Sequence, residues 1–144
     1  MTLPDGWVVV DQKDWLIRAR LPGKGELFLL SGYNPNPATL DAWIQGNLAG
    51  DQKADPNAKI CQGPEDVTIP NGPAAKGYII CSTIVPQGGG AAYEAYDLFN
   101  TQIDETAKVV YELEIWTSKG TFDEVLAAVR SQISETVVWK LYQP

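Results

Sequence analysis

Two strand-length segments of this sequence are apolar on both of their faces. Residues 26–31 read Glu-Leu-Phe-Leu-Leu-Ser, and residues 77–85 read Gly-Tyr-Ile-Ile-Cys-Ser-Thr-Ile-Val. Successive side chains of a strand point to opposite faces of its sheet, so a strand of this kind needs cover on both faces. The sequence therefore predicts a sheet with one packed layer above it and another below it.

Other segments alternate between apolar and polar residues, which is typical of strands with one buried face. In the clearest of them, residues 107–116, the inward positions are Val109, Tyr111, Leu113 and Ile115, and the outward positions are Lys108, Glu112 and Glu114. Glu112 and Glu114 would lie about 7 Å apart, which is a spacing that catalytic carboxyl pairs use. The alternating charge favours a solvent-exposed face instead. Further strands are expected at residues 7–10, 14–21, 58–62, 66–69 and 91–99, with a short strand or extended tail at 137–142.

Two segments have the apolar spacing of helices that bury one side. The first would begin with Thr39 as its N-cap and end at Gly46 or Gly50. The second would begin with a capping box formed by Thr121 and Glu124. The apolar stripes are Leu40, Trp43, Ile44 and Leu48 in the first helix, and Phe122, Val125, Leu126, Val129 and Ile133 in the second.

The order of these elements predicts a single α+β domain over residues 1–144, because strands and helices do not alternate as they do in parallel sheets. One helix on each face of the sheet gives a three-layer α/β/α sandwich. The central sheet would be mainly antiparallel, with about six or seven strands. A chain of 144 residues buries enough surface to fold without a metal or a cofactor.

Several short motifs are shared with a known group of proteins. They are Pro4-Asp5-Gly6-Trp7, Thr39-Leu40-Asp41, residues 71–78 ahead of a central strand, and residues 109–115 followed by Thr121-Phe122-Asp123-Glu124-Val125. In this order they resemble the PsbP-like superfamily, which includes photosystem II lumenal proteins, Ran-binding nucleotide-release factors, bacterial lipoproteins and secretion-effector chaperones. The resemblance implies a non-enzymatic binding or assembly role. It carries over no catalytic residue, and the metal-binding histidines of some plant members have no counterpart.

The chain contains no histidine, and its 18 acidic against 11 basic residues give a net charge of −7. Without an imidazole base, Ser-His-Asp and Cys-His catalysis are excluded, and no catalytic residue, metal or cofactor is expected. The polar residues Asp51, Asp55 and Asn57 lack the spacing of a calcium loop, so a polar loop is the preferred interpretation. The negative charge disfavours nucleic acid and anionic membranes as partners.

The two cysteines, Cys61 and Cys81, both lie in segments that we interpret as β-strands. Turn signals between them allow the chain to double back, so we predict a disulfide. Such a bond persists in oxidising compartments, and it favours an extracytoplasmic location. The alternative is a pair of buried thiols that act as small apolar residues. No apolar stretch has the ~18 residues of a membrane span, so we expect that residues 1–144 do not insert into a membrane. A lipid tether upstream of these residues is compatible with this expectation.

Trp116 and Tyr96 are the candidate contact surface, because each falls on the more polar face of its predicted strand. Exposed aromatic residues are enriched where proteins bind partners. The alternative is that a helix covers both rings.

Together these observations favour a non-enzymatic, extracytoplasmic binding or assembly module, of the secreted or lipoprotein type, that recognises a protein or peptide. The alternative is an intracellular protein-binding adaptor or chaperone of the same fold. Two buried, neighbouring carboxyl groups in a pocket, with strongly shifted pKa values, would instead indicate catalysis.

Overall fold

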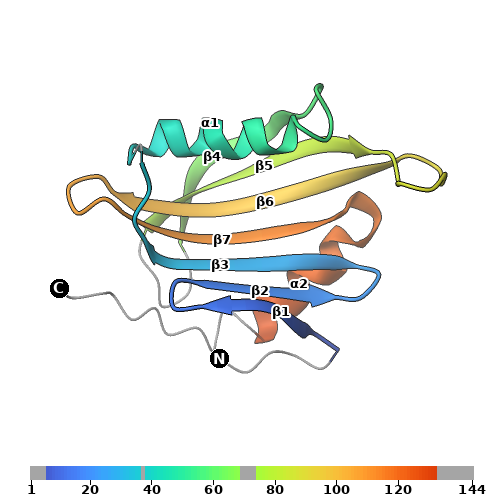
Figure 1. Cartoon of the computed structure of the whole chain (residues 1–144), viewed down its shortest axis with the longest axis horizontal. Coiled ribbons are helices and arrows are strands. Elements are labelled where there is room, and N and C mark those ends of the chain that lie inside the picture. Colours follow the sequence, from blue (N-terminus) through green and yellow to red (C-terminus); the bar gives the residue numbers. More distant parts are fainter. Residues whose placement is uncertain (1–5, 37, 69–73, 133–144) are drawn as a thin grey trace.

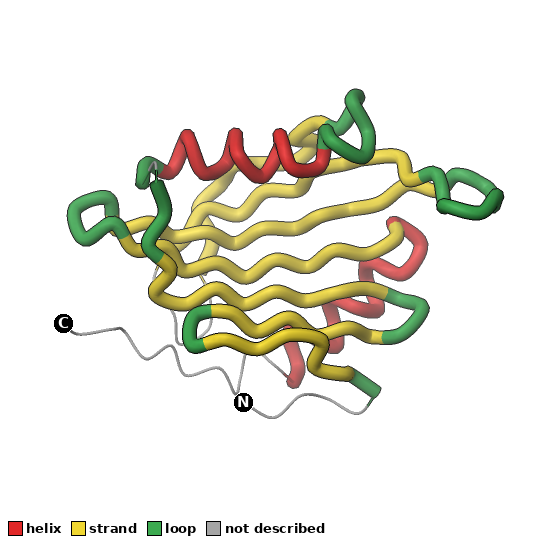
Figure 2. The backbone as a smooth tube through the Cα atoms, in the orientation of Figure 1, coloured by secondary structure: helices red, strands yellow, loops and turns green. Residues whose placement is uncertain are grey.

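The computed structural model describes residues 6–36, 38–68 and 74–132. These residues form one seven-stranded sheet and two α-helices (Figure 1; Figure 2). In chain order the elements are β1 (Val8–Lys13), β2 (Leu16–Leu21), β3 (Gly25–Tyr33), α1 (Leu40–Asp51), β4 (Lys59–Thr68), β5 (Ala74–Ile84), β6 (Tyr93–Asp104), β7 (Val109–Ser118), the short 3-10 helix η1 (Lys119–Thr121) and α2 (Phe122–Gln132).

The strands lie in the order β1-β2-β3-β7-β6-β5-β4, and every neighbouring pair is antiparallel. The sheet therefore consists of two meanders, β1 to β3 and β4 to β7, which meet where β3 pairs with β7. Helix α1 carries the chain across one face of the sheet between the two meanders (Figure 1). The predicted antiparallel sheet is confirmed.

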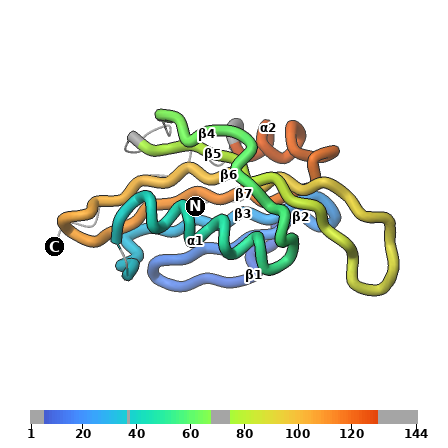
Figure 3. The backbone as a smooth tube through the Cα atoms, turned by 90° about the horizontal axis from the view of Figure 1, so that it is seen from above, coloured from blue at the N-terminus to red at the C-terminus, as the bar shows by residue number. Residues whose placement is uncertain are grey.

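The two helices contact side chains that alternate along β7. Leu113 and Ile115 belong to the same apolar cluster as Val125 and Val129 of α2. Glu112, the residue before Leu113, accepts a hydrogen bond from Trp43 of α1. Alternate residues of a strand point to opposite faces, so α1 and α2 contact different faces of the sheet, and Figure 3 shows them on opposite sides of β3 and β7. We call these the α1 face and the α2 face.

The larger apolar cluster lies on the α2 face and extends across the sheet. Its buried members are Trp7, Ala19, Leu27, Leu29, Ala75, Tyr111, Leu113, Ile115, Val125 and Val129. The smaller cluster lies beneath α1 and consists of Ile44, Ala58, Tyr78, Ile80 and Phe99. Each fully buried aliphatic or aromatic side chain contributes about 1.5–3 kcal/mol relative to exposure, so both helices are held by their apolar stripes.

Helix α1 begins as predicted, because the Thr39 hydroxyl accepts a hydrogen bond from the amide of Ala42. Gly46 lies inside the helix, which continues to Asp51. Helix α2 begins at Phe122, directly after Thr121, as predicted. Thr121 also closes the 3-10 turn, and the Glu124 carboxylate forms an ion pair with Lys24, which the sequence did not predict.

The two short strands predicted at 58–62 and 66–69 are one strand, β4, in the structure. Its pairing with β5 shifts register between Ile60 and Gln62 and again between Gln62 and Glu65. Gly63 lies in the second irregular stretch with φ +79°, and a Cβ there would come within 2.4 Å of the Gly77 carbonyl oxygen. Glycine at this position therefore allows the strand to continue through a bulge, where the sequence predicted a gap between two strands. The predicted element at 137–142 lies outside the described residues.

The prediction of a solvent-exposed face for Glu112 and Glu114 was wrong. The alternation along β7 is as expected, because the two glutamates point to one face of the sheet while Leu113 and Ile115 point to the other. The face that carries them, however, is the one that α1 crosses, and Glu112 is only 1% exposed. A strand pattern shows which residues share a face, but the cover on that face comes from an element elsewhere in the chain.

Candidate functional site

The predicted disulfide between Cys61 and Cys81 is confirmed, with the two Cα atoms 5.8 Å apart. Lys59 is the residue of β4 that lies opposite Cys81, and Cys61 lies at the first register shift of that strand. The bulge brings the Cys61 sulfur to Cys81. Because β4 is the edge strand and Cys61 is exposed, the bond joins the edge of the sheet to its neighbour at the surface. The alternative of two buried thiols is excluded.

The structure does not bring Trp116 and Tyr96 to one surface. Trp116 lies opposite Asp97, whereas Tyr96 lies opposite Thr117, so the two rings point to different faces of the sheet. Tyr96 is half-buried against Phe122 at the start of α2, with ring centroids 5.2 Å apart. For Tyr96, the alternative of cover by a helix therefore holds.

Trp116 belongs to a row of directly opposed residues that crosses the α1 face. The row runs Arg20, Glu26, Trp116, Asp97 and Ile80, one residue from each of β2, β3, β7, β6 and β5. Ile80 lies in the cluster beneath α1, and Asp97 is also buried. Arg20 and Trp116 are not covered in this way, so the row passes from the core to an open part of the same face.

A cavity of about 500 Å³ lies at this open part, and we call it the Trp116 cavity. Its volume falls within the range of about 300–1,000 Å³ that is usual for ligand sites. Its lining comes from the β2–β3 turn and from the four strands β2, β3, β6 and β7. Its polar and aromatic side chains belong to Arg20, Lys24, Glu26, Tyr93, Trp116 and Ser118.

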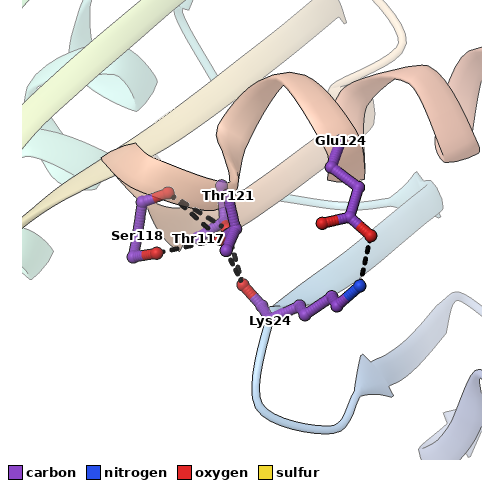
Figure 4. A network of polar contacts seen from close by, with 5 residues as sticks. All are labelled: Lys24, Thr117, Ser118, Thr121 and Glu124. Carbon is purple, nitrogen blue, oxygen red and sulfur yellow. Dashed lines mark hydrogen bonds and ion pairs between the residues drawn. The ribbon is translucent and has the colours of Figure 1, made fainter.

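The β2–β3 turn, which forms one wall of the cavity, is fixed to β7 and to the start of α2 (Figure 4). The hydroxyl groups of Thr117 and Thr121 lie 2.5 and 3.1 Å from the carbonyl oxygen of Lys24. The Lys24 ammonium forms an ion pair with Glu124. At Gly25, a Cβ would lie 2.7 Å from the Trp116 carbonyl oxygen. A glycine at this position therefore allows the turn to pack closely against the strand that carries Trp116.

One carboxylate in the lining is shared by two arginines. Arg18 Nη2 lies 2.6 Å from Glu26 Oε2, and Arg20 Nη2 lies 2.5 Å from Glu26 Oε1. Burial on its own would raise the pKa of Glu26, but the hydrogen bonds and charges of Arg18 and Arg20 hold it below its usual value. Glu26 is therefore ionised at neutral pH and balances only one of the two guanidinium charges.

A second group of carboxyl groups, which we call the acid cluster, lies deeper on the α1 face. It consists of Asp51, Asp97, Glu112 and Glu114. Glu112 Oε2 accepts hydrogen bonds from Thr101 Oγ1 at 2.5 Å, Trp43 Nε1 at 2.6 Å and Asn47 Nδ2 at 3.0 Å. Burial nevertheless raises the pKa of Glu112 above its usual value, against these three donors.

Asp97 is also buried and Glu114 is half-buried, and the two carboxyl groups interact electrostatically. Burial raises the pKa of Glu114 to about 8, and the charges of Glu112, Asp51 and Glu26 add to this effect. Burial also raises the pKa of Asp97, followed by the charge of Glu114. The buried Oδ1 of Asp97 has no hydrogen-bond partner among the described residues. The acid cluster therefore retains protons at a pH where exposed carboxyl groups have lost them.

Sequence reasoning missed the acid cluster, although one signal for it was present. Trp43 and Asn47 lie four residues apart and thus on one side of α1, and both carry N–H donors that reach Glu112. Donors on the buried side of a helix indicate an acceptor on the sheet beneath. Asp51, at the end of the same helix, is half-buried, and its partial burial raises its pKa to about 6.

The loop acids grouped in the sequence have separate roles. Asp55 Oδ1 accepts a hydrogen bond from the amide of Asn57 at 2.9 Å, and its Oδ2 accepts one from the amide of Thr83 at 2.7 Å. Asp55 thus fixes the loop after α1 to β5, while Asp51 belongs to the acid cluster. Within the described part of the chain, no three Cys, Asp or Glu side chains are grouped so that they could hold a metal ion.

Among the residues that the structure describes, no helix has the length and apolar character needed to cross a membrane. Comparison of the chain with protein-family models, with curated proteins and with solved structures finds no match. The features of the chain that bear on function are the Trp116 cavity, the acid cluster and the disulfide.

Proposed function

We propose that this chain is an extracytoplasmic binding module, and that it recognises a protein or peptide partner at the Trp116 cavity. The observation that carries the proposal is the cavity itself, which places a tryptophan and an arginine at the open part of the α1 face. Tryptophan, tyrosine and arginine dominate the binding energy of protein interfaces. Of the two aromatic residues selected from the sequence, Trp116 is the one that lies at such a place.

The positions of the buried carboxyl groups support binding over catalysis. Asp97 and Glu112 are 5% and 1% exposed, and neither they nor Glu114 line the Trp116 cavity. A catalytic acid or base must come within hydrogen-bond reach of its substrate. Asp97 and Glu112 have the burial and raised pKa values of a catalytic pair, but they lie outside the lining of the Trp116 cavity.

The hydroxyl group in the lining also supports binding. Ser118 Oγ lies 2.8 Å from the Thr121 hydroxyl, which in turn lies 2.7 Å from the Thr117 hydroxyl. These groups hold the turn, and among the described residues no basic side chain is hydrogen-bonded to them, as activation of a nucleophile would require.

The disulfide supports the extracytoplasmic location over the intracellular alternative. Thiol systems of the cytosol reduce accessible disulfides, and Cys61 is exposed. The location is tested by alkylating the free thiols of the protein in intact cells of its source before lysis. Complete protection of both cysteines agrees with the proposal, and two alkylated cysteines would favour the intracellular adaptor.

We also propose that the fold is a three-layer sandwich of the PsbP-like type. The contacts of α1 and α2 with different faces of one antiparallel sheet support this assignment. So does the element order, in which one helix joins two meanders and the second follows the last strand.

Binding at the Trp116 cavity is tested by selecting ligands from a random peptide library displayed on phage, with the oxidised protein as bait. Trp116→Ala should lower the affinity for the selected peptides at least tenfold. Tyr96→Ala is the matched control, since it removes an aromatic residue from the opposite face, and it should leave the affinity unchanged. Circular dichroism confirms that both variants are folded. Equal losses in the two variants, or no selected peptide, would contradict the proposal.

A further inference from the structure

We propose that the Trp116 cavity selects an acidic peptide segment that carries a large apolar side chain beside a carboxylate. The inference rests on the proposed function and adds the chemistry of the partner. In this arrangement the apolar side chain lies against Trp116 and Tyr93, and the carboxylate binds Arg20.

The apolar half of the proposal rests on the two aromatic rings. Trp116 near the end of β7 and Tyr93 at the start of β6 both line the cavity, and both are half-buried. Each ring is therefore partly supported by the protein and partly open. Aromatic side chains held in this way provide a large contact area with little loss of conformational entropy on binding.

The acidic half rests on the way in which Arg20 is bonded. Arg20 Nε and Nη2 bind Glu26 Oε1 at 2.7 and 2.5 Å, while Nη1 has no partner among the described residues. The Arg20 side chain is 50% exposed. A guanidinium group with free, accessible donors is well suited to a carboxylate.

A basic ligand would find no equivalent partner. Arg20 occupies one oxygen of Glu26 and Arg18 occupies the other. Lys24 is ion-paired with Glu124, so the excess positive charge comes from the two arginines that share the single carboxylate of Glu26. The lining is thus positive on a chain whose net charge is −7, and this local reversal of sign selects for an acidic group.

The overall charge also limits how large the acidic partner is. A long polyanion would meet the negative charge of the rest of the surface, whereas a short segment meets only the positive cavity. The apolar rings in turn favour a peptide over a free inorganic anion, which would leave them uncovered. A short acidic and apolar peptide segment satisfies both conditions.

The test uses four hexapeptides and the oxidised, 15N-labelled protein. The reference peptide is Ac-Gly-Ser-Phe-Glu-Ser-Gly-NH2, and the other three replace Glu by Gln, Glu by Lys, or Phe by Ala. Chemical shifts of the Trp116 indole N–H give each dissociation constant. We expect the reference peptide to bind at least fivefold more tightly than the Gln and Ala peptides, with the Lys peptide weakest.

Arg20→Gln should remove the difference between the Glu and Gln peptides. Lys76→Gln is the charge-matched control on β5, where Lys76 pairs with Asp66, and it should keep the difference. Equal binding of the Glu, Gln and Lys peptides, or tighter binding of the Lys peptide, would overturn the inference while the proposed function stands. Absence of saturable shifts with all four peptides would also overturn it, and the phage selection then decides the proposed function separately.

Discussion

Raising the pH from 5 to 9 should destabilise this protein, because the acid cluster must lose protons that it holds in the folded state. Burial raises the pKa of Glu114 from 4.5 to about 8. Between these two values the folded chain binds a proton that the unfolded chain has released. The free energy of unfolding therefore falls as the pH rises through this window, and the loss levels off above pH 8.

The structure gives the size of this effect. For Glu114 alone, the gap between 4.5 and about 8 corresponds to a total loss of about 5 kcal/mol, or roughly 1 to 2 kcal/mol per pH unit. The raised pKa values of Asp97 and Glu112 have the same sign and make the slope steeper. The lowered pKa of Glu26 acts in the opposite direction, but its stabilising effect is lost only as the pH falls below 4.5.

The assay is urea-induced unfolding, followed by circular dichroism at one-unit steps from pH 5 to pH 9. Glu114→Gln should reduce the slope, because the amide does not titrate, and should make the variant more stable than the native chain at pH 9. Glu65→Gln, at an exposed position on β4, is the matched control and should leave the slope unchanged. A stability that is flat or rising between pH 5 and pH 8 would refute the reasoning, as would equal slopes for Glu114→Gln and the native chain.

Three further perturbations test the other parts of the structure. Replacing Cys61 and Cys81 together by serine should lower the free energy of unfolding by about 3 kcal/mol, because the disulfide closes a loop with a sequence separation of 20 residues and so restricts the unfolded chain. Urea titrations should show the same loss when the native chain is reduced. An unchanged unfolding midpoint would contradict this expectation. Gly25→Ala should destabilise by about 1–3 kcal/mol and weaken peptide binding, because its Cβ would meet the Trp116 carbonyl oxygen; unaltered calorimetric melting would disprove this. Thr117→Val should lower the free energy of unfolding by about 1 kcal/mol and should speed amide exchange in the β2–β3 turn. An unchanged exchange rate would show that the hydroxyl group does not hold the turn.

The antiparallel sheet could be predicted because its signals are local. The alternation of Leu113 and Ile115 with polar neighbours follows from strand geometry alone, and the disulfide followed from turn signals between two β segments. The burial of Glu112 could not be predicted in this way. It depends on which face α1 crosses, and this is decided by packing between parts of the chain that are far apart in sequence.

The Trp116 cavity was partly predictable. Trp116 was identified from its position on the more polar face of a strand, and the structure places it in the lining. Arg20 and Glu26 were not singled out, because their meeting with Trp116 requires the register of β2, β3 and β7. Pairing between β3 and β7 joins opposite ends of the sequence, and no local pattern specifies it.

The pairing of β3 with β7 also has a consequence for how the chain assembles. Leu29 lies opposite Leu113, so this ladder joins two meanders that are each built from neighbours in sequence. Contacts between distant segments form late, because closing the long loop between the segments costs entropy before the contacts contribute any favourable energy. The chain should therefore behave as two halves that dock. Cleavage in the loop at residues 52–57 should yield fragments that recombine into the native sheet, in the manner of fragment complementation.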